Sequence, residues 1–185
     1  MEQTAVPAAR TEIAPYVGLA VLVGIVLVGW AAPSSYEIYK MLHVLAAVVW
    51  VGGGVLLTIL ALLTQRSNDP VALANIGRQA ELVGARIFTP ASVIVVVFGI
   101  AMIEKGDLGW DHFWIDVALV AWAITFLVGV GFFVPQTKRL NALVEEHGVE
   151  HPVVQAKLAQ ILTVARLDVA MLLLVVADMT AKPFG

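Results

Sequence analysis

Four side chains that can bind a metal ion lie in or beside long apolar stretches of the chain: His43, His112, Asp116 and Asp178. An ionisable group within a membrane-spanning segment is costly and usually faces the interior of a helix bundle or a water-filled cavity. A neutral imidazole is the commonest side-chain metal ligand, and its second nitrogen normally needs an orienting carboxylate or carbonyl. These residue types predict that His43 binds a metal ion, with Asp116 or Asp178 as orienting partner or further ligand.

His112 is the only candidate for a second histidine ligand on the same side of the membrane. It stands four residues before Asp116, a spacing that places two helical residues on one face. A site with both histidines as ligands would need His112 to lie deeper than this position implies, whereas a mixed histidine and carboxylate cation site would not. In the alternative interpretation, His43 only donates a hydrogen bond to a neighbouring carbonyl or to Asp178 and fixes the register of its helix.

The stretch from Tyr36 to Arg66 carries His43 and contains enough apolar residues to cross a bilayer core, which needs about 20. On a helix, residues three or four positions apart share a face. One face of this stretch is small and weakly polar, and it comprises His43, Ala47, Trp50, Gly54 and Thr58. Small residues let a neighbouring helix or a flat ligand approach the backbone closely. We therefore expect Trp50 and Gly54 to border a cofactor bound by His43.

Composition indicates a membrane protein. Hydrophobic residues make up 60% of the 185 residues, charged residues only 14%, and the mean hydropathy is +0.90. The chain has no cysteine, which excludes thiolate metal sites and disulfides. A net charge of −3 without a basic run argues against nucleic acid as a partner. The lipid bilayer is the expected partner, and a homo-oligomer or another membrane protein is an open alternative.

Five apolar segments qualify as transmembrane helices, at residues 13–32, 36–63, 87–103, 113–134 and 167–180. The sequence thus predicts an all-α polytopic membrane helix bundle with five transmembrane helices. A four-helix core at residues 36–185 follows an additional N-terminal helix at 13–35. Residues 1–12 are polar and are expected to form a short tail.

Capping residues predict the helix boundaries. Residues 67–69 are Ser, Asn and Asp, each able to cap a helix whose first turn contains Pro70. We expect this helix to lie on the membrane surface or to extend the following span. Pro135 is expected to close the fourth span, Gly148 to end the polar helix after it, and Pro152 to open the last helix.

Lys and Arg are concentrated in two connections, with three in residues 65–86 and four in residues 136–166, whereas residues 33–40 and 104–112 have one each. Because short cytoplasmic loops carry the excess of Lys and Arg, we expect a cytoplasmic N-terminus and an extracytoplasmic C-terminus. His43 and Asp178 then lie in the outer leaflet. A second charged set at the inner face is expected to play a structural role: Glu81, Arg86, Arg166 and Asp168.

Three stretches carry a resemblance to known families: L-H-V-L-A-A-V-V-W-V-G-G-G from Leu42, A-R-I-F-T-P-A from Ala85 and M-T-A-K-P-F from Met179. The first resembles the first core helix of the copper resistance protein D (CopD) family and the opening of the HemJ-type protoporphyrinogen oxidases. The chain is most similar to a bacterial predicted integral membrane protein family in this group, over residues 36–185. The resemblance implies a multi-pass protein of the bacterial inner membrane.

The resemblance also implies a bundle that holds a b-type haem or another porphyrin. His43 matches the histidine of the first core helix, and Arg86 matches the arginine before the T-P-A turn. Lys40 lies one turn before His43 and would supply a further positive charge. One departure counts against the oxidase. Asp116 stands near the position where that enzyme has a lysine, so an anion replaces a cation suited to a propionate or to proton donation.

Three functions agree with these observations. The first is a non-enzymatic membrane module that binds haem or a metal ion in the outer leaflet through His43. The second is a HemJ-like porphyrin oxidoreductase that uses His43, Arg86 and Lys40. The third is a structural or assembly protein without a cofactor, whose polar residues only hold the bundle together.

Overall fold

The computed structural model describes residues 36–67 and 69–183, together with residues 20, 23–24 and 27. Four helices in this part are long and apolar enough to cross a membrane: Tyr36–Ser67, Asn75–Lys105, Phe113–His147 and Pro152–Ala181. The described residues form no strand. The expected all-α polytopic bundle is therefore confirmed for its four-helix core, whereas the additional helix expected at 13–35 lies almost wholly outside the described residues.

Three of the four long helices contain a π-helical segment. The first consists of α2 (Tyr36–Ala47), η1 (Val48–Gly52) and α3 (Gly53–Ser67). The second consists of α4 (Pro70–Val83), η2 (Gly84–Phe88) and α5 (Thr89–Lys105). The third consists of α6 (Phe113–Leu127), η3 (Val128–Phe133) and α7 (Val134–His147), and the fourth is the single helix α8 (Pro152–Ala181).

Two of these π-helical segments accommodate a proline. In a regular α-helix the proline ring collides with the carbonyl four residues back and removes a hydrogen bond. Here the N–H of Thr89 bonds to the carbonyl of Gly84, five residues back, just before Pro90. The N–H of Val134 likewise bonds to the carbonyl of Gly129, just before Pro135. The helix therefore continues through Pro135 to His147, and the expectation that Pro135 closes the fourth span is wrong.

The other boundary signals are confirmed. Asp69 caps α4, because one carboxylate oxygen accepts hydrogen bonds of 3.0 Å from the N–H groups of Val71 and Ala72. The helix it caps runs on through η2 into α5, so it extends the following span. Gly148 ends α7 with a φ of 79°, a conformation that glycine adopts readily, and Pro152 opens α8.

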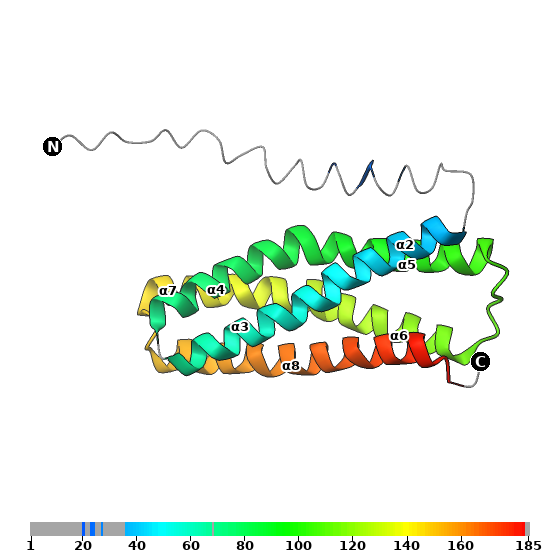
Figure 1. Cartoon of the computed structure of the whole chain (residues 1–185). Coiled ribbons are helices and arrows are strands. Elements are labelled where there is room, and N and C mark those ends of the chain that lie inside the picture. The colour runs from blue at the N-terminus through cyan, green and yellow to red at the C-terminus, as the bar shows by residue number, and fades with distance from the viewer. Residues whose placement is uncertain (1–19, 21–22, 25–26, 28–35, 68, 184–185) are drawn as a thin grey trace.

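The helices pack in pairs along the bundle, with α2 against α5, α6 against α8 and α4 against α7. Tyr39 and Phe98 stack at 5.9 Å in the α2–α5 interface, where Ala46 is also buried. Figure 1 shows α3 beside α8 at one end of the bundle, whereas α2 and α8 separate toward the other end.

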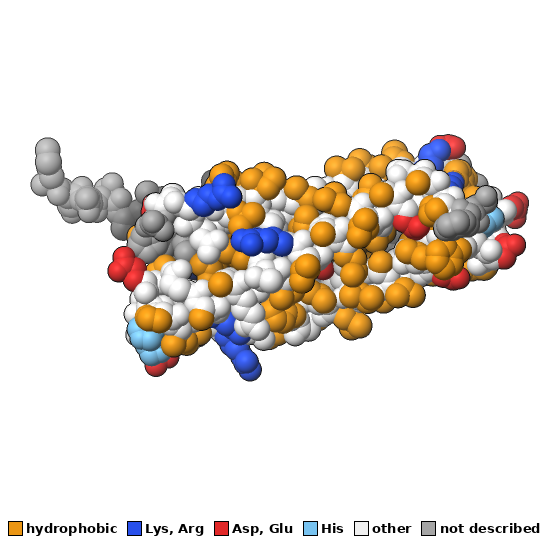
Figure 2. Space-filling model, turned by 90° about the horizontal axis from the view of Figure 1, so that it is seen from below, with side chains coloured by type: hydrophobic (Ala, Val, Ile, Leu, Met, Phe, Trp, Pro, Cys, Tyr) orange, Lys and Arg blue, Asp and Glu red, His pale blue; other side chains and the backbone are white. Residues whose placement is uncertain are grey.

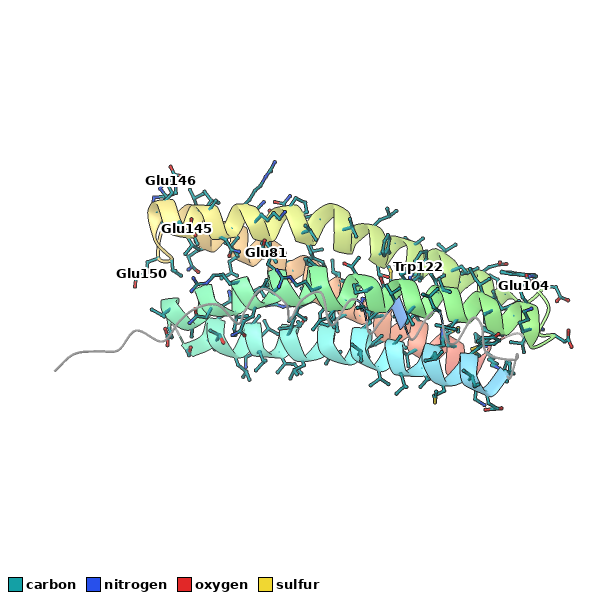
Figure 3. All side chains as sticks on the ribbon, turned by 90° about the horizontal axis from the view of Figure 1, so that it is seen from above. Glu81, Glu104, Trp122, Glu145, Glu146 and Glu150 are labelled. Atoms are coloured by element: carbon teal, nitrogen blue, oxygen red, sulfur yellow. The ribbon has the colours of Figure 1, made fainter. Side chains whose placement is uncertain are left out.

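The bundle is longer than a bilayer core. Its long helices have 30 to 35 residues, which corresponds to at least about 45 Å against a core of about 30 Å. Figure 2 shows hydrophobic side chains along the middle of one face and most charged side chains toward the two ends. Glu104 lies at one end, and Glu145, Glu146 and Glu150 lie at the other (Figure 3). A separate apolar cluster holds the second end together, formed by Leu140, Val154, Leu158 and Leu162.

Candidate functional site

A cavity of about 480 Å³ lies among α2, α5, α6 and α8, and we call it the histidine cavity. Its wall is almost wholly apolar, and His43 is the one ionisable side chain among its described lining residues. Val44 and Val48 of the first long helix and Leu173 and Val176 of α8 line it and are also exposed. The cavity therefore opens on the membrane-facing surface where α2 and α8 separate.

His43 is held by the neighbouring helix. Its Nδ1 lies 2.8 Å from the carbonyl oxygen of Val95 in α5. Because a carbonyl oxygen only accepts hydrogen bonds, Nδ1 is the donor, and Nε2 of the neutral ring is left with a lone pair. Nε2 makes no hydrogen bond within the described part of the chain. This is the arrangement in which a histidine binds a metal, with one nitrogen oriented by a hydrogen bond and the other available.

Gly99 of α5 lets the His43 ring approach the Val95 carbonyl, and this glycine was not identified from the sequence. A Cβ atom at position 99 would lie 3.3 Å from both Nδ1 and Cε1 of His43, closer than side chains normally pack. Gly99 stands one turn after Val95, so the missing side chain exposes the carbonyl that His43 reaches. In the sequence, Gly99 is only a lone glycine within the apolar run of α5. It does not indicate that His43, 52 residues before Val95, packs at this point.

The carboxylates do not orient His43. The Val95 carbonyl, and neither Asp116 nor Asp178, is the hydrogen-bond partner of His43 Nδ1. Asp116 is exposed in the first turn of α6. The Oδ2 atom of Asp178 is buried and has no hydrogen-bond partner among the described residues. Neither residue lines the histidine cavity.

His112 precedes the helix and is not part of it. Its backbone is extended, with φ −102° and ψ 121°, and α6 begins at the next residue. The expected shared helical face of His112 and Asp116 is therefore not formed. His112 Nε2 lies 2.9 Å from the carbonyl oxygen of Leu108, within the connection between α5 and α6. No group of three or more His, Asp and Glu side chains suited to a metal ion occurs in the part of the chain that the structure describes.

The two expected cations are not among the residues that line the histidine cavity. Lys40 forms an ion pair of 2.9 Å with Glu37 on the exposed side of α2, and its ammonium also lies 5.4 Å from the centre of the Tyr36 ring. Arg86 is exposed in η2. Because neither side chain lines the histidine cavity, the structure does not bring together the three residues that a HemJ-like reaction would use.

Trp50 and Gly54 border a second cavity of about 190 Å³, which we call the carboxylate cavity because Glu81 and Asp168 line it. Trp50 lines both cavities, whereas Gly54 lines only the second. Sequence analysis placed Glu81 and Asp168 in a structural set at the inner face. Asn141 of α7 donates a hydrogen bond of 2.6 Å to Glu81, which supports this role for Glu81.

Trp122 of α6 also lies inside the bundle (Figure 3) and was not identified from the sequence. Its indole N–H donates a hydrogen bond of 3.0 Å to the carbonyl of Ser92 in α5. Its ring lines the histidine cavity and stacks on Phe126 at 5.3 Å. Trp122 therefore fixes α6 against α5 and forms one rigid wall of the cavity.

Four long apolar helices with charged ends define a polytopic integral membrane protein. Residues 37–183 match the family described as predicted integral membrane protein (DUF2269), and the chain belongs to this family. No curated protein and no solved structure matches the chain significantly. The family match leaves the narrower relation to the CopD and HemJ families a hypothesis.

Proposed function

We propose that the protein is a non-enzymatic membrane module that binds haem in the histidine cavity, with Nε2 of His43 as the axial ligand of the iron. The observation that carries this proposal is the hydrogen bond of 2.8 Å from His43 Nδ1 to the Val95 carbonyl. It fixes the ring and its tautomer and leaves Nε2 available at the wall of an apolar cavity.

The size and lining of the cavity support a large, flat, apolar ligand. Its volume of about 480 Å³ falls within the range of about 300–1,000 Å³ typical of small-molecule sites. The indole rings of Trp114 and Trp122 contribute flat apolar surface to its wall. The opening between α2 and α8 faces the hydrocarbon of the bilayer, from which a hydrophobic ligand can enter directly.

The donor set favours haem over a bare metal ion. A bare metal ion needs several protein ligands. In the described part of the chain, His43 does not belong to a group of three or more His, Asp or Glu side chains that could hold one. Haem iron needs only one protein ligand, because the four porphyrin nitrogens supply the others. A single oriented imidazole is therefore sufficient for haem and insufficient for an isolated transition-metal ion.

The test is an absorbance spectrum of the protein purified after expression with haem precursors and trace metals. We expect the wild type to show a haem Soret band and His43→Ala to lose it. His112→Ala is the matched control, because His112 is the other histidine at this end of the bundle and lies outside the cavity. A wild type that takes up no haem when haem is supplied, or a His43→Ala variant that binds it as well as the wild type, would refute the proposal.

A structural role is the second candidate, since the same His43–Val95 hydrogen bond joins α2 to α5. Hydrogen bonds between membrane helices contribute about 0.6 kcal/mol on average. If this is the only role of His43, His43→Ala lowers the thermal stability of the purified bundle slightly, and no cofactor accompanies the wild type. Haem in the wild type at one per chain would exclude the purely structural account.

A further inference from the structure

Lys182 follows the last residue of α8 and contacts Trp114, a residue that lines the histidine cavity. Its ammonium nitrogen is 5.1 Å from the centre of the Trp114 ring, and Trp114 is buried and lines the cavity. Met179, two residues before the end of α8, lines the same cavity and packs near Trp114. The Trp114 ring therefore has the apolar cavity on one side and a cation close to its face.

A backbone hydrogen bond fixes Lys182 at the end of α8. The N–H of Lys182 bonds to the carbonyl of Asp178 at 2.8 Å and closes the last turn of α8. Lys182 adopts the left-handed conformation, with φ 45° and ψ 57°, which is uncommon for a residue with a side chain. Glycine is the usual residue at such a helix end, so lysine at this position has a conformational cost.

The charge of Lys182 has no acidic partner in the described residues. No carboxylate oxygen there lies within 4.0 Å of its ammonium, whereas Lys40 is paired with Glu37 at 2.9 Å. A long lysine side chain near the end of a membrane helix places its charge at the water interface and its methylenes along apolar surface. Lys182 is thus an exposed cation next to the apolar lining of the histidine cavity.

We propose that Lys182 forms an ion pair with a carboxylate on the edge of the ligand, so that the histidine cavity selects a porphyrin that carries propionate groups. The inference rests on the proposed function because it places a porphyrin in the same cavity. The apolar ring system lies among α2, α5, α6 and α8, and the propionates point toward the interface at Lys182. A charge-assisted hydrogen bond of this kind contributes about a factor of ten to binding.

The experiment compares metal-free protoporphyrin IX with its dimethyl ester, in which both carboxylates are masked, by fluorescence titration of the full-length protein in nanodiscs. We expect the wild type to bind the free acid about tenfold more tightly than the ester. Lys182→Ala should abolish this preference, and Lys182→Arg should retain it. Lys105→Ala is the matched control, because Lys105 is an exposed cation at the same end of the bundle and does not line the cavity.

The metal-free probe separates this inference from the proposed function. Protoporphyrin IX has no iron to bind His43, so a Lys182-dependent preference without haem uptake would refute axial ligation and leave the carboxylate site in place. Equal binding of acid and ester by the wild type overturns the inference even if haem binds through His43. A preference that survives in Lys182→Ala also overturns it.

A lipid phosphate is the alternative partner of Lys182. If anionic phosphatidylglycerol in the nanodisc displaces the porphyrin from wild type and not from Lys182→Ala, the natural partner of Lys182 is a lipid phosphate and the assignment to porphyrin is wrong.

Discussion

Gly53 at the start of α3 lies against the ring of Phe88 in η2, so closely that a Cβ atom at position 53 would stand 2.5 Å from Cε1 of Phe88. This contact joins the first two long helices at the level of their π-helical segments. Packing between small residues is a main source of association between helices in lipid. The glycine therefore determines how closely these two helices approach.

We expect Gly53→Leu to lower the stability of the bundle by about 2 kcal/mol, the cost of overpacking a close contact. The matched control is Gly52→Leu, because no atom lies within 4 Å of a Cβ at position 52. Gly54→Leu should fall between them, since its nearest neighbour, Cγ2 of Val169, is 4.0 Å away. Thermal unfolding in detergent gives the ranking. Adding Phe88→Ala should recover part of the loss in Gly53→Leu, and no recovery would mean that Phe88 is not the obstacle.

Gly99→Ala should weaken haem binding through His43. The added methyl group would lie 3.3 Å from Nδ1 and Cε1, so the ring must shift slightly, and we expect this shift to weaken its hydrogen bond to Val95. Loss of the partner that orients a metal-binding histidine typically lowers affinity about tenfold or more. Haem titration of Gly99→Ala and of Gly131→Ala, where a Cβ meets nothing within 4 Å, provides the comparison. Equal affinity of both variants and wild type would show that the Val95 hydrogen bond does not support the site.

Lys182→Gly should raise the free energy of unfolding by about 1 kcal/mol, because glycine adopts the left-handed conformation without the steric cost of a Cβ atom. The same change should abolish the preference for the free acid of protoporphyrin IX. Asp107→Gly is the control for the backbone effect, since Asp107 also has a positive φ, of 51°, and aspartate tolerates this conformation better than lysine. Thermal stability of Lys182→Gly at or below that of the wild type would contradict the expected conformational cost.

The orientation of the bundle can be measured with single cysteines because the chain has none of its own. The excess of Lys and Arg in residues 65–86 and 136–166 predicts that the end of the bundle at Gly148 is cytoplasmic. A membrane-impermeant maleimide should therefore label Lys105→Cys in intact cells and Glu150→Cys only after permeabilisation. The reverse pattern would invert the predicted orientation and place His43 in the inner leaflet.

Local sequence signals predicted the helices and several of their ends. The four apolar segments of the core, the Asp69 cap and the Gly148 end are determined by residues next to one another in the chain, and all were predicted correctly. The π-helical segments were not predicted. Two of them precede a proline and accommodate its ring, so Pro135 indicated a helix end that does not occur.

The candidate site was predicted only in part, because the rotation of each helix depends on its neighbours. His43 and Trp50 line the histidine cavity, whereas Gly54 of the same predicted face lines only the carboxylate cavity. Asp116 and Asp178 were placed near His43 by their depth in the membrane, which does not determine the direction in which a side chain points. Gly99 and Lys182 gain their significance from contacts with His43 and Trp114, which no local pattern in the sequence reveals.

The opening of the histidine cavity between α2 and α8 determines which porphyrin concentration governs binding. A porphyrin that enters from the hydrocarbon is presented to the protein at its mole fraction in the bilayer, and its total concentration in the sample matters little. At a fixed amount of porphyrin, additional empty vesicles should dilute the ligand and lower the occupied fraction of the protein, as mass action requires. Cells that make more membrane without more porphyrin would empty the site in the same way.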